Sequence, residues 1–454
     1  MNKPSQIVLP EGFSRRTFLK TSTAMAGGAV LGALAPERYA HGASASDEIK
    51  IALIGCGGRG SGAANQALST YPIGPVKLIA MADIHPDRLE SSLSNLQKTH
   101  AERVDVPKER QFLGFDAFKK AIELADVCIL ATPPGFRPMM FEEAVKQGKN
   151  IFMEKPVATD APGIRRVLAA AEEAKKKNLK VAVGLQRHHQ AGYIETIKRL
   201  HDGEIGDIVS MRAYWDGRRP WQKKRADLEK MYKEKGWGEL SEMAYQLRNW
   251  YYFVWTCGDH ICEQHIHNID VINWIKKGHP VKARAMGGRE INYGGPDDGE
   301  IFDHFAVQYE YEDGSTSFSE CRQQAGCWDS VSEHVVGTKG HCDVSKFQIA
   351  GAGEPWRYKA EGAKDPYQQE HDDLFTAIRQ NKDYIEAVYG AESTMTAILG
   401  RMAAYSGKEI EWSKALASQI NLFPDKLDFN AKPKVLPGPD GYYPRAIPGK
   451  SEVV

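Results

Sequence analysis

The sequence shows no excess of charge of either sign, because its 59 Lys and Arg residues balance 59 Asp and Glu residues over 454 positions. Proteins that bind nucleic acid or a membrane surface commonly carry a basic excess, so neither partner is predicted. The seven cysteines include no Cys-x-x-Cys pair, which argues against a zinc ribbon and a thioredoxin-type site. A disulfide among the later cysteines is left open. Internal repeats and low-complexity segments are also absent, and the length predicts two or three domains.

The N-terminal segment reads as a targeting signal. Arg15 and Arg16 precede a short uncharged run at 23–35, and Ala43-Ser44-Ala45 follows. This combination is typical of a bacterial twin-arginine (Tat) export signal, and the run is too short for the about 20 residues of a membrane anchor. We expect residues 1–46 to be signal and linker, the Tat translocase to be a partner during export, and the mature protein to be periplasmic or otherwise exported. A disordered N-terminal arm is the alternative.

A glycine cluster organises the mature chain. The apolar run at 49–54 stops at Gly55-x-Gly57-x-x-Gly60, and small apolar residues then recur at helical spacing. This pattern predicts strand, tight turn and helix. The first glycine permits the turn, the second lets the backbone approach a pyrophosphate, and the third lets the helix pack on the strand. The predicted phosphate-binding residues are Gly55, Gly57, Gly58, Arg59 and Gly60.

An acidic residue ends the second predicted strand, at 76–83. Asp83 lies 23 residues after Gly60, close to the spacing at which a carboxylate accepts the ribose hydroxyls of NAD. A carboxylate there repels a 2′-phosphate, and no Arg or Lys follows immediately, so NAD is predicted rather than NADP. The alternative is an Asp that caps the next helix.

Strands and helices alternate up to residue 186, which predicts an α/β domain with a parallel, doubly wound sheet. The expected strands are near 126–134, 150–153 and 181–185, and the expected helices are 138–148 and 162–177. Later, alternation at 305–314 predicts an antiparallel strand ending in an Asp-Gly hairpin turn, and helices are expected near 367–380 and 390–405. The predicted divisions are 1–46, signal and linker; 47–186, nucleotide-binding domain; 187–421, substrate and oligomerisation domain; and 422–454, surface tail.

Two segments carry candidate catalytic groups. Lys155, in Glu154-Lys155-Pro156, follows a strand end on the ligand-binding edge of the sheet, where a lysine can hydrogen-bond a substrate hydroxyl. Taken alone, the sequence around Lys155 is also consistent with an ordinary surface lysine that has no catalytic role. Further along, Glu263, His267 and Asp270 share one face of a predicted helix, and a His held by a carboxylate one turn away is a candidate acid/base group.

The histidines of the second segment have two other readings. His260, His265 and His267 with Glu263 are suitable zinc ligands, but neither H-E-x-x-H nor H-x-x-E-H is present, so no metal is predicted. The other reading is a buried helix whose histidines are merely satisfied by hydrogen bonds.

Taken together, these motifs resemble the Gfo/Idh/MocA oxidoreductase family, and the resemblance covers nearly the whole mature chain. It rests on Gly55-x-Gly57-x-x-Gly60, Asp83, Ala131-Thr132-Pro133, Glu154-Lys155-Pro156, Gly184-x-Gln186-Arg187, the Glu263, His267 and Asp270 segment, and Gly337-Thr338-x-Gly340. It implies a Rossmann domain followed by an α/β domain with a large, mainly antiparallel open sheet, often used for homodimer or homotetramer contacts.

The resemblance also implies roles for residues. Lys155 would orient a substrate hydroxyl, His267 would be the general base, and Glu263 would lie beside it. The implied NAD contacts, beyond the glycine turn and Asp83, are Thr132, Pro133, Glu154, Lys155, Gln186 and Arg187. Two departures bear on the substrate. Arg137 stands where many relatives have His, and the glycine-rich start of the catalytic helix is reduced to Gly258-Asp259-His260.

The sequence-based hypothesis is an exported NAD-dependent oxidoreductase that acts on a sugar, cyclitol or related polyol. Because free NAD is scarce outside the cytoplasm, we expect a tightly bound cofactor that is recycled internally. One alternative is an NAD-dependent glycoside hydrolase that oxidises the sugar transiently. Another is a non-catalytic sugar-binding protein on a dehydrogenase scaffold, against which the presence of both Lys155 and His267 argues.

Overall fold

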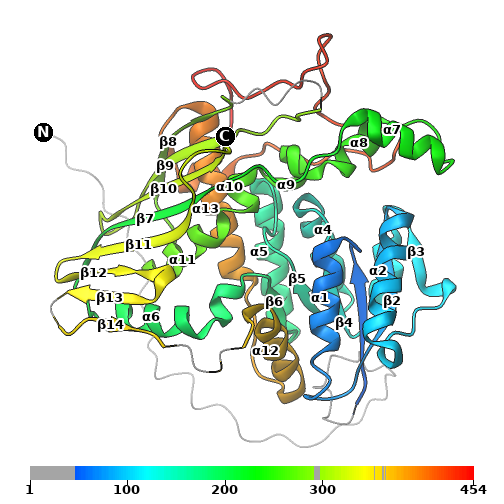
Figure 1. Cartoon of the computed structure of the whole chain (residues 1–454), viewed down its shortest axis with the longest axis horizontal. Helices are drawn as coiled ribbons and strands as arrows, with labels where there is room; N and C mark the ends of the chain where they lie inside the picture. Colours follow the sequence, from blue (N-terminus) through cyan, green and yellow to red (C-terminus); the bar gives the residue numbers. More distant parts are fainter. Residues whose placement is uncertain (1–46, 291–296, 352, 360–361, 363) are drawn as a thin grey trace, which may run out of the picture. The chain divides into compact units, whose positions relative to one another are not determined.

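The computed structural model describes residues 47–290, 297–351, 353–359, 362 and 364–454, so the predicted export signal at 1–46 lies outside the described residues. The first part of this chain builds a six-stranded parallel sheet in the order β3-β2-β1-β4-β5-β6 (Figure 1). The strand order reverses between β1 and β4, the position at which doubly wound sheets bind ligands. Its strands are β1 (Ile49–Ile54), β2 (Val76–Asp83), β3 (Gln111–Leu113), β4 (Val127–Leu130), β5 (Asn150–Met153) and β6 (Val181–Val183).

Helices cover both faces of this sheet, because its central strands are apolar on both sides. One buried cluster joins the strands to α3, α4 and α5, and a second joins them to α1, α2 and α12. The helices are α1 (Gly58–Leu68), α2 (Pro86–Thr99), α3 (Ala117–Leu124), α4 (Arg137–Lys146), α5 (Ala161–Lys176) and α12 (Pro366–Gln380). The last of them returns from far along the chain to complete the nucleotide-binding fold.

A nine-stranded sheet follows, in the order β14-β13-β12-β11-β7-β10-β9-β8-β15. Neighbouring strands pair antiparallel except β7 and β10, which are parallel. Its strands are β7 (Ile208–Gly217), β8 (Lys282–Gly288), β9 (His304–Glu310), β10 (Thr316–Gln323), β11 (Ser330–Gly337), β12 (Gly340–Asp343), β13 (Gln348–Gly351), β14 (Trp356–Arg357) and β15 (Ile410–Glu411).

Helices pack against one face of this second sheet (Figure 1). The helices of this part are α6 (Ala191–His201), α10 (His260–Glu263), α11 (Ile266–Lys276), α13 (Ala387–Ser406) and α14 (Trp412–Ala417). Among them, α13 is buried along most of its length and contacts both β8 and β9. The short 3₁₀ helices are η2 (Ala101–Arg103), η3 (Lys108–Arg110), η4 (Pro134–Phe136), η5 (Gln186–His189), η6 (Trp250–Tyr252) and η7 (Val344–Lys346).

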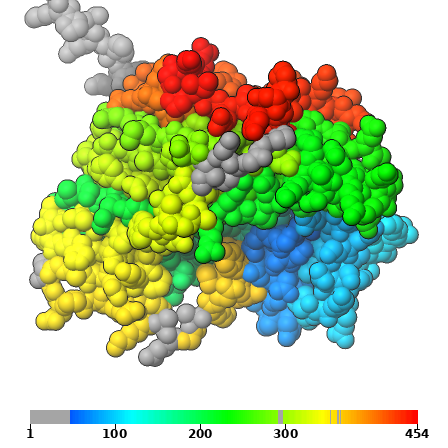
Figure 2. Space-filling model, turned by 45° about the horizontal axis from the view of Figure 1, so that its top comes forward, coloured from blue at the N-terminus to red at the C-terminus, as the bar shows by residue number. Residues whose placement is uncertain are grey.

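Two segments without a place in either sheet complete the fold. We name residues 218–253 the insert; it contains α7 (Arg225–Glu234), α8 (Glu242–Arg248) and η6, and α9 (Val254–Cys257) follows it. We name residues 422–454 the tail; it contains no helix or strand. Figure 2 shows the tail, in red, lying against the green region that contains the insert. Phe253 of the insert meets Tyr443 of the tail with ring centroids 4.9 Å apart.

The predicted fold class is confirmed, since a parallel Rossmann sheet is followed by a large, mainly antiparallel sheet. The predicted Asp-Gly hairpin is also present, because β9 and β10 pair antiparallel around Gly314, whose φ is +79°. The tail, predicted to lie on the surface, buries part of its aromatic content, as Tyr443 is only 4% exposed.

Candidate active site

One continuous cavity of about 500 Å³ runs along the carboxyl ends of β1, β2, β4 and β5 and reaches the second domain. Most of the predicted site residues line it. These are Gly55, Gly57, Gly58, Arg59, Gly60, Asp83, Thr132, Pro133, Glu154, Lys155, Glu263 and His267. The cavity therefore joins the predicted nucleotide-binding residues to the predicted catalytic residues.

The glycine turn has the shape that a dinucleotide pyrophosphate requires. Gly55 has a φ of +92°, and a Cβ atom there would lie 2.6 Å from the backbone of Ala131. A Cβ on Gly60 would come within 1.9 Å of the Gly55 carbonyl oxygen, so only glycine lets α1 approach the turn. A Cβ on Gly57 would meet nothing within 4 Å, because this residue faces the cavity. The backbone is thus open to a phosphate where α1 begins.

Asp83 lies at the end of β2 and at one end of the cavity. Its carboxylate accepts hydrogen bonds from the backbone N–H groups of Cys56, at 2.6 Å, and His85, at 2.8 Å. Burial raises the pKa of Asp83, and these hydrogen bonds oppose the increase. The carboxylate is oriented by the backbone on both sides, which suits an acceptor for ribose hydroxyls.

Arg59, although it belongs to the glycine turn, is held by carboxylates. Its guanidinium pairs with Glu154 at the end of β5, and with Glu370 of α12 at 2.9 Å. Burial alone would lower the pKa of Arg59, but the two carboxylates raise it above its ordinary value. The side chain therefore ties the turn to β5 and to the returning helix.

The catalytic end of the cavity is built around Lys155. Its Nζ donates to the Glu263 carbonyl oxygen at 2.5 Å and lies 3.1 Å from the Glu263 carboxylate. His267 lies on the same cavity, and its ring stacks on Trp215 with centroids 5.8 Å apart. In the described part of the chain, the His267 Nδ1 has no hydrogen-bond partner. Burial, followed by the charges of Lys155, Arg187 and Arg59, lowers the pKa of His267 well below its usual value, so the imidazole is neutral.

The predicted carboxylate–histidine pair is not formed. The single predicted helix is divided at Gln264 and His265 into α10 and α11, and the carboxylate of Glu263 pairs with Lys155. Asp270 instead accepts hydrogen bonds from His188 and Ser393, both at 2.8 Å. The reason for the break is tertiary, since the buried His265 Nε2 lies 2.6 Å from the Ser319 hydroxyl of β10.

Gln186 and Arg187, predicted as cofactor contacts, do not line the cavity. The Gln186 side chain donates to the hydroxyl of Tyr367, which does line it. Arg187 pairs with the buried carboxylate of Glu333, which also accepts a hydrogen bond from Asn268 at 2.6 Å. Arg187 lies in η5 and pairs with Glu333 of β11 in the second sheet. Its contribution to the site is its positive charge, which lowers the pKa of His267.

Arg137, which takes the position of a histidine in many relatives, is buried and holds the ends of two strands together. Its guanidinium donates to the carbonyl oxygens of Leu130, Thr132 and Glu154 at 2.7 to 2.8 Å. Burial lowers the pKa of Arg137 to about 10. These bonds fix the ends of β4 and β5, from which Thr132 and Lys155 project.

The insert supplies cavity residues that sequence reasoning missed: Trp221, Leu247, Arg248 and Trp250. Arg248 is nearly inaccessible, and both terminal nitrogens bind the carboxylate of Asp87 at the start of α2, at 2.8 and 2.9 Å. The crowding of aromatic residues in this region was the available signal, but it did not indicate which rings face the cavity.

Among the described residues, no group of three or more His, Cys, Asp or Glu side chains is placed to hold a metal ion. Within the same part of the chain, no helix is both long enough and apolar enough to span a bilayer. All seven cysteines are free thiols, and only Cys327 is exposed.

Two family models match the chain. The model described as "Oxidoreductase family, NAD-binding Rossmann fold" matches residues 49–184, and the model of the "GFO/IDH/MocA C-terminal domain" matches residues 193–343. The resemblance drawn from the motifs is thereby confirmed, and the first model identifies an NAD-binding Rossmann domain.

Individual relatives are distant. An inositol 2-dehydrogenase from Ralstonia nicotianae is 29% identical over 158 residues, which cover 35% of this chain and 43% of that protein. A glycosyl hydrolase family 109 protein from Shewanella pealeana is 23% identical over 231 residues, covering 47% of this chain and 48% of that protein. The aligned regions thus span less than half of either relative.

The solved structures that match show the same fold. One is scyllo-inositol dehydrogenase from Lactobacillus casei with bound NAD(H) and scyllo-inositol. It has a TM-score of 0.58 and 20% sequence identity, and the match covers 81% of this chain and 100% of that one. Because the sequence identity is only 20%, this similarity shows a shared fold, that is, the same arrangement of the two sheets.

Proposed function

The chain belongs to the Gfo/Idh/MocA family of oxidoreductases, and on this premise we propose that it transfers a hydride between NAD and a sugar, cyclitol or related polyol. The observation that carries the proposal is the single cavity that contains both the glycine turn with Asp83 and the Lys155, Glu263 and His267 group. When bound, NAD supplies the nicotinamide carbon that exchanges the hydride.

The chain's own residues account for binding and proton transfer. The open face of Gly57 and the carboxylate of Asp83 fit the pyrophosphate and a ribose. Lys155 donates a hydrogen bond to the reacting oxygen of the substrate, while Glu263 holds its ammonium group in place. His267, neutral because of its burial and its cationic neighbours, accepts the hydroxyl proton.

The test is to incubate purified protein with a panel of sugars and cyclitols and to follow NADH absorbance. At least one polyol should reduce the nucleotide with wild-type protein, and none should do so after His267→Ala. Absence of reduction by every polyol, in protein shown to contain NAD, would contradict the proposal.

We further propose that the cofactor remains bound and is recycled by a second sugar-like substrate. The support is the insert, whose Arg248 and Trp250 line the cavity and whose Arg248 binds Asp87 of the nucleotide-binding domain. Prolonged dialysis followed by nucleotide assay tests this. An apoprotein that is fully active only with added NAD would refute it.

We also propose that the protein is exported through the twin-arginine route, because Arg15 and Arg16 precede a short uncharged run. Export of folded protein would carry the bound cofactor to a compartment where free NAD is scarce. Replacing both arginines by lysine should retain the protein in the cytoplasm; unaltered export would refute the assignment.

A homodimer or homotetramer is proposed through the helix-free face of the second sheet. Met286 of β8 and Phe318 of β10 lie on this face and are 77% and 46% exposed. Exposed apolar side chains on one face commonly mark a subunit contact. Light scattering should show an oligomer that Met286→Asp with Phe318→Asp dissociates; an unchanged mass would contradict this surface.

NAD-dependent glycoside hydrolysis is the second candidate, and the likeness to the glycosyl hydrolase family 109 protein favours it. Such a reaction oxidises the sugar, eliminates the aglycone, adds water to the unsaturated intermediate and then returns the hydride, so no external NAD is consumed. Aryl glycosides discriminate between the two functions. Phenol release without net NADH formation would support the hydrolase, and reduction without phenol release would support the oxidoreductase.

A further inference from the structure

Trp221 of the insert is an exposed aromatic residue at the active-site cavity. Its side chain is 46% exposed, yet it lines the same cavity as Lys155 and His267. A large, partly exposed ring in a cavity wall leaves apolar surface in water unless a ligand covers it. None of the proton-transfer steps assigned above uses this ring.

The ring of Trp221 is held by its neighbours without being covered face to face. Trp250, Tyr251 and Tyr252 meet it at centroid distances of 5.9 to 6.4 Å and interplanar angles of 60° to 90°. In the described part of the chain, no aromatic ring lies parallel to it. The packing therefore fixes the ring while leaving it available for a stacking partner.

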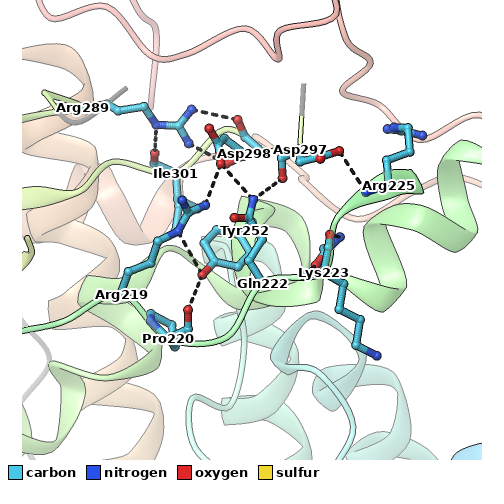
Figure 3. A network of polar contacts seen from close by, with 12 residues as sticks. Arg219, Pro220, Gln222, Lys223, Arg225, Tyr252, Arg289, Asp297, Asp298 and Ile301 are labelled. Atoms are coloured by element: carbon cyan, nitrogen blue, oxygen red, sulfur yellow. Dashed lines mark hydrogen bonds and ion pairs between the residues drawn. The ribbon is translucent and has the colours of Figure 1, made fainter. Parts of the chain in front are cut away.

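The backbone on both sides of Trp221 is fixed as well. Figure 3 shows Arg219 binding Asp298 at 2.9 Å, and the Tyr252 hydroxyl donating to the Pro220 carbonyl at 3.0 Å. Gln222, on the other side, donates to the Asp297 carbonyl at 2.6 Å. Because hydrogen bonds fix the segment on both sides of Trp221, its ring is preorganised. A ligand that stacks on the ring therefore binds with little loss of protein conformational entropy.

A chain of contacts connects Trp221 to the catalytic segment. Tyr251, whose ring centroid is 6.4 Å from that of Trp221, is hydrogen-bonded through its hydroxyl to Gln323. Gln323 in turn donates to Gln264, the neighbour of Glu263. Trp221 and Lys155 line the same cavity, and Tyr251, Gln323 and Gln264 connect Trp221 to the catalytic segment.

We propose that Trp221 is a stacking platform for a second sugar ring, and that the substrate class is a glycoside or short oligosaccharide. The inference rests on the proposed function for the ring that binds at Lys155. The apolar face of a pyranose stacks on an indole ring, while its hydroxyls remain in water at the exposed edge. The first ring would react, and the second would contribute affinity and specificity.

The experiment compares Trp221→Ala and Trp221→Phe with a matched control, Trp328→Ala. Trp328 is 62% exposed and lies outside the cavity, beside Tyr214. The probes are glucose, cellobiose and maltose, measured by kcat/KM for nucleotide reduction and by calorimetric binding. Trp221→Ala should lower affinity and kcat/KM for the preferred disaccharide by about tenfold and leave values for glucose nearly unchanged. Trp221→Phe should retain most of the preference, and Trp328→Ala all of it.

Other outcomes overturn the inference. Equal preference of the wild type for glucose and both disaccharides, or equal losses on all probes in Trp221→Ala, would refute a second-ring platform. Release of NAD from folded Trp221→Ala would make this ring a cover for the cofactor instead. Failure of the proposed function looks different: wild-type protein would reduce no nucleotide, while calorimetry would still report disaccharide binding that Trp221→Ala weakens.

Discussion

Lys155 is the residue on which the proposed chemistry depends most directly. Replacing it by Met removes the ammonium group that contacts Glu263 and, in the proposed function, would contact the reacting oxygen of the substrate. We expect kcat to fall by about 10²- to 10⁴-fold, while copurifying NAD is retained because the glycine turn and Asp83 are intact. Steady-state kinetics and nucleotide assay check this.

The matched control for Lys155 is Lys276→Met, which removes a lysine paired with Asp313 away from the cavity. It should leave turnover unchanged. Normal turnover of Lys155→Met would refute the role given to Lys155 and would favour a sugar-binding protein without catalysis.

His267 sets the expected pH dependence. Because burial and nearby cations lower its pKa well below 6.5, it stays neutral and able to accept a proton as the pH falls through that value. The acidic limb of kcat/KM should therefore lie well below pH 6.5. An acidic limb of the wild-type kcat/KM at or above pH 6.5 would contradict this reading of the site.

At the residue scale, the sequence motifs and the family resemblance predicted one site containing the glycine turn, Asp83, Lys155 and His267, and these residues line one cavity. The motifs did not predict the partners of the charged groups. Glu263 binds Lys155, which is 108 positions away in sequence, and Asp270 binds His188. Such pairings depend on how two domains meet, and a local pattern carries no information about that.

At the scale of elements, the ends of β4 and β5 depend on Arg137. Arg137→Leu would leave the carbonyls of Leu130, Thr132 and Glu154 without this donor in a buried setting. We expect the free energy of unfolding to fall by about 3 kcal/mol, and kcat to fall because Thr132 and Lys155 lose their support. Chemical denaturation and kinetics measure both.

The control for Arg137 is Arg166→Leu, which removes a half-exposed pairing with Glu142 and should change stability by less than about 1 kcal/mol. An Arg137→Leu protein as stable as the wild type would show that Arg137 does not stabilise the ends of β4 and β5.

The periodicity of most elements was sufficient to predict them, with boundaries close to those observed: the helix expected at 162–177 is α5, Ala161–Lys176. The helix expected through Glu263 and His267 failed, because burial of His265 against Ser319 interrupts it. The role of α12 was also unpredictable, since its sequence shows a helix but not that it returns to the first sheet.

At the scale of the whole described molecule, two hydrogen bonds from Arg248 to the Asp87 carboxylate join the insert to the nucleotide-binding domain. Asp87→Ala breaks this bidentate pair without removing a residue that lines the cavity. The buried guanidinium then loses its carboxylate partner, the insert is held less firmly to the nucleotide-binding domain, and we expect NAD to dissociate about tenfold faster. Dilution into a nucleotide trap measures the rate.

Asp105→Ala is the matched control for Asp87→Ala, because it removes an exposed carboxylate paired with Arg110. It should not alter NAD release. Equal release rates for the Asp87 variant and the wild type would show that the insert does not retain the cofactor.

The most direct test of the account is the mass of the nucleotide that copurifies with the protein, recorded before and after addition of a saccharide deuterated on its carbons. We predict NAD before addition and reduced nucleotide carrying one deuterium afterwards, with no label in Lys155→Met. Copurification of NADP, or NAD that acquires no deuterium from any reactive saccharide, would contradict hydride transfer between NAD and a sugar at this site.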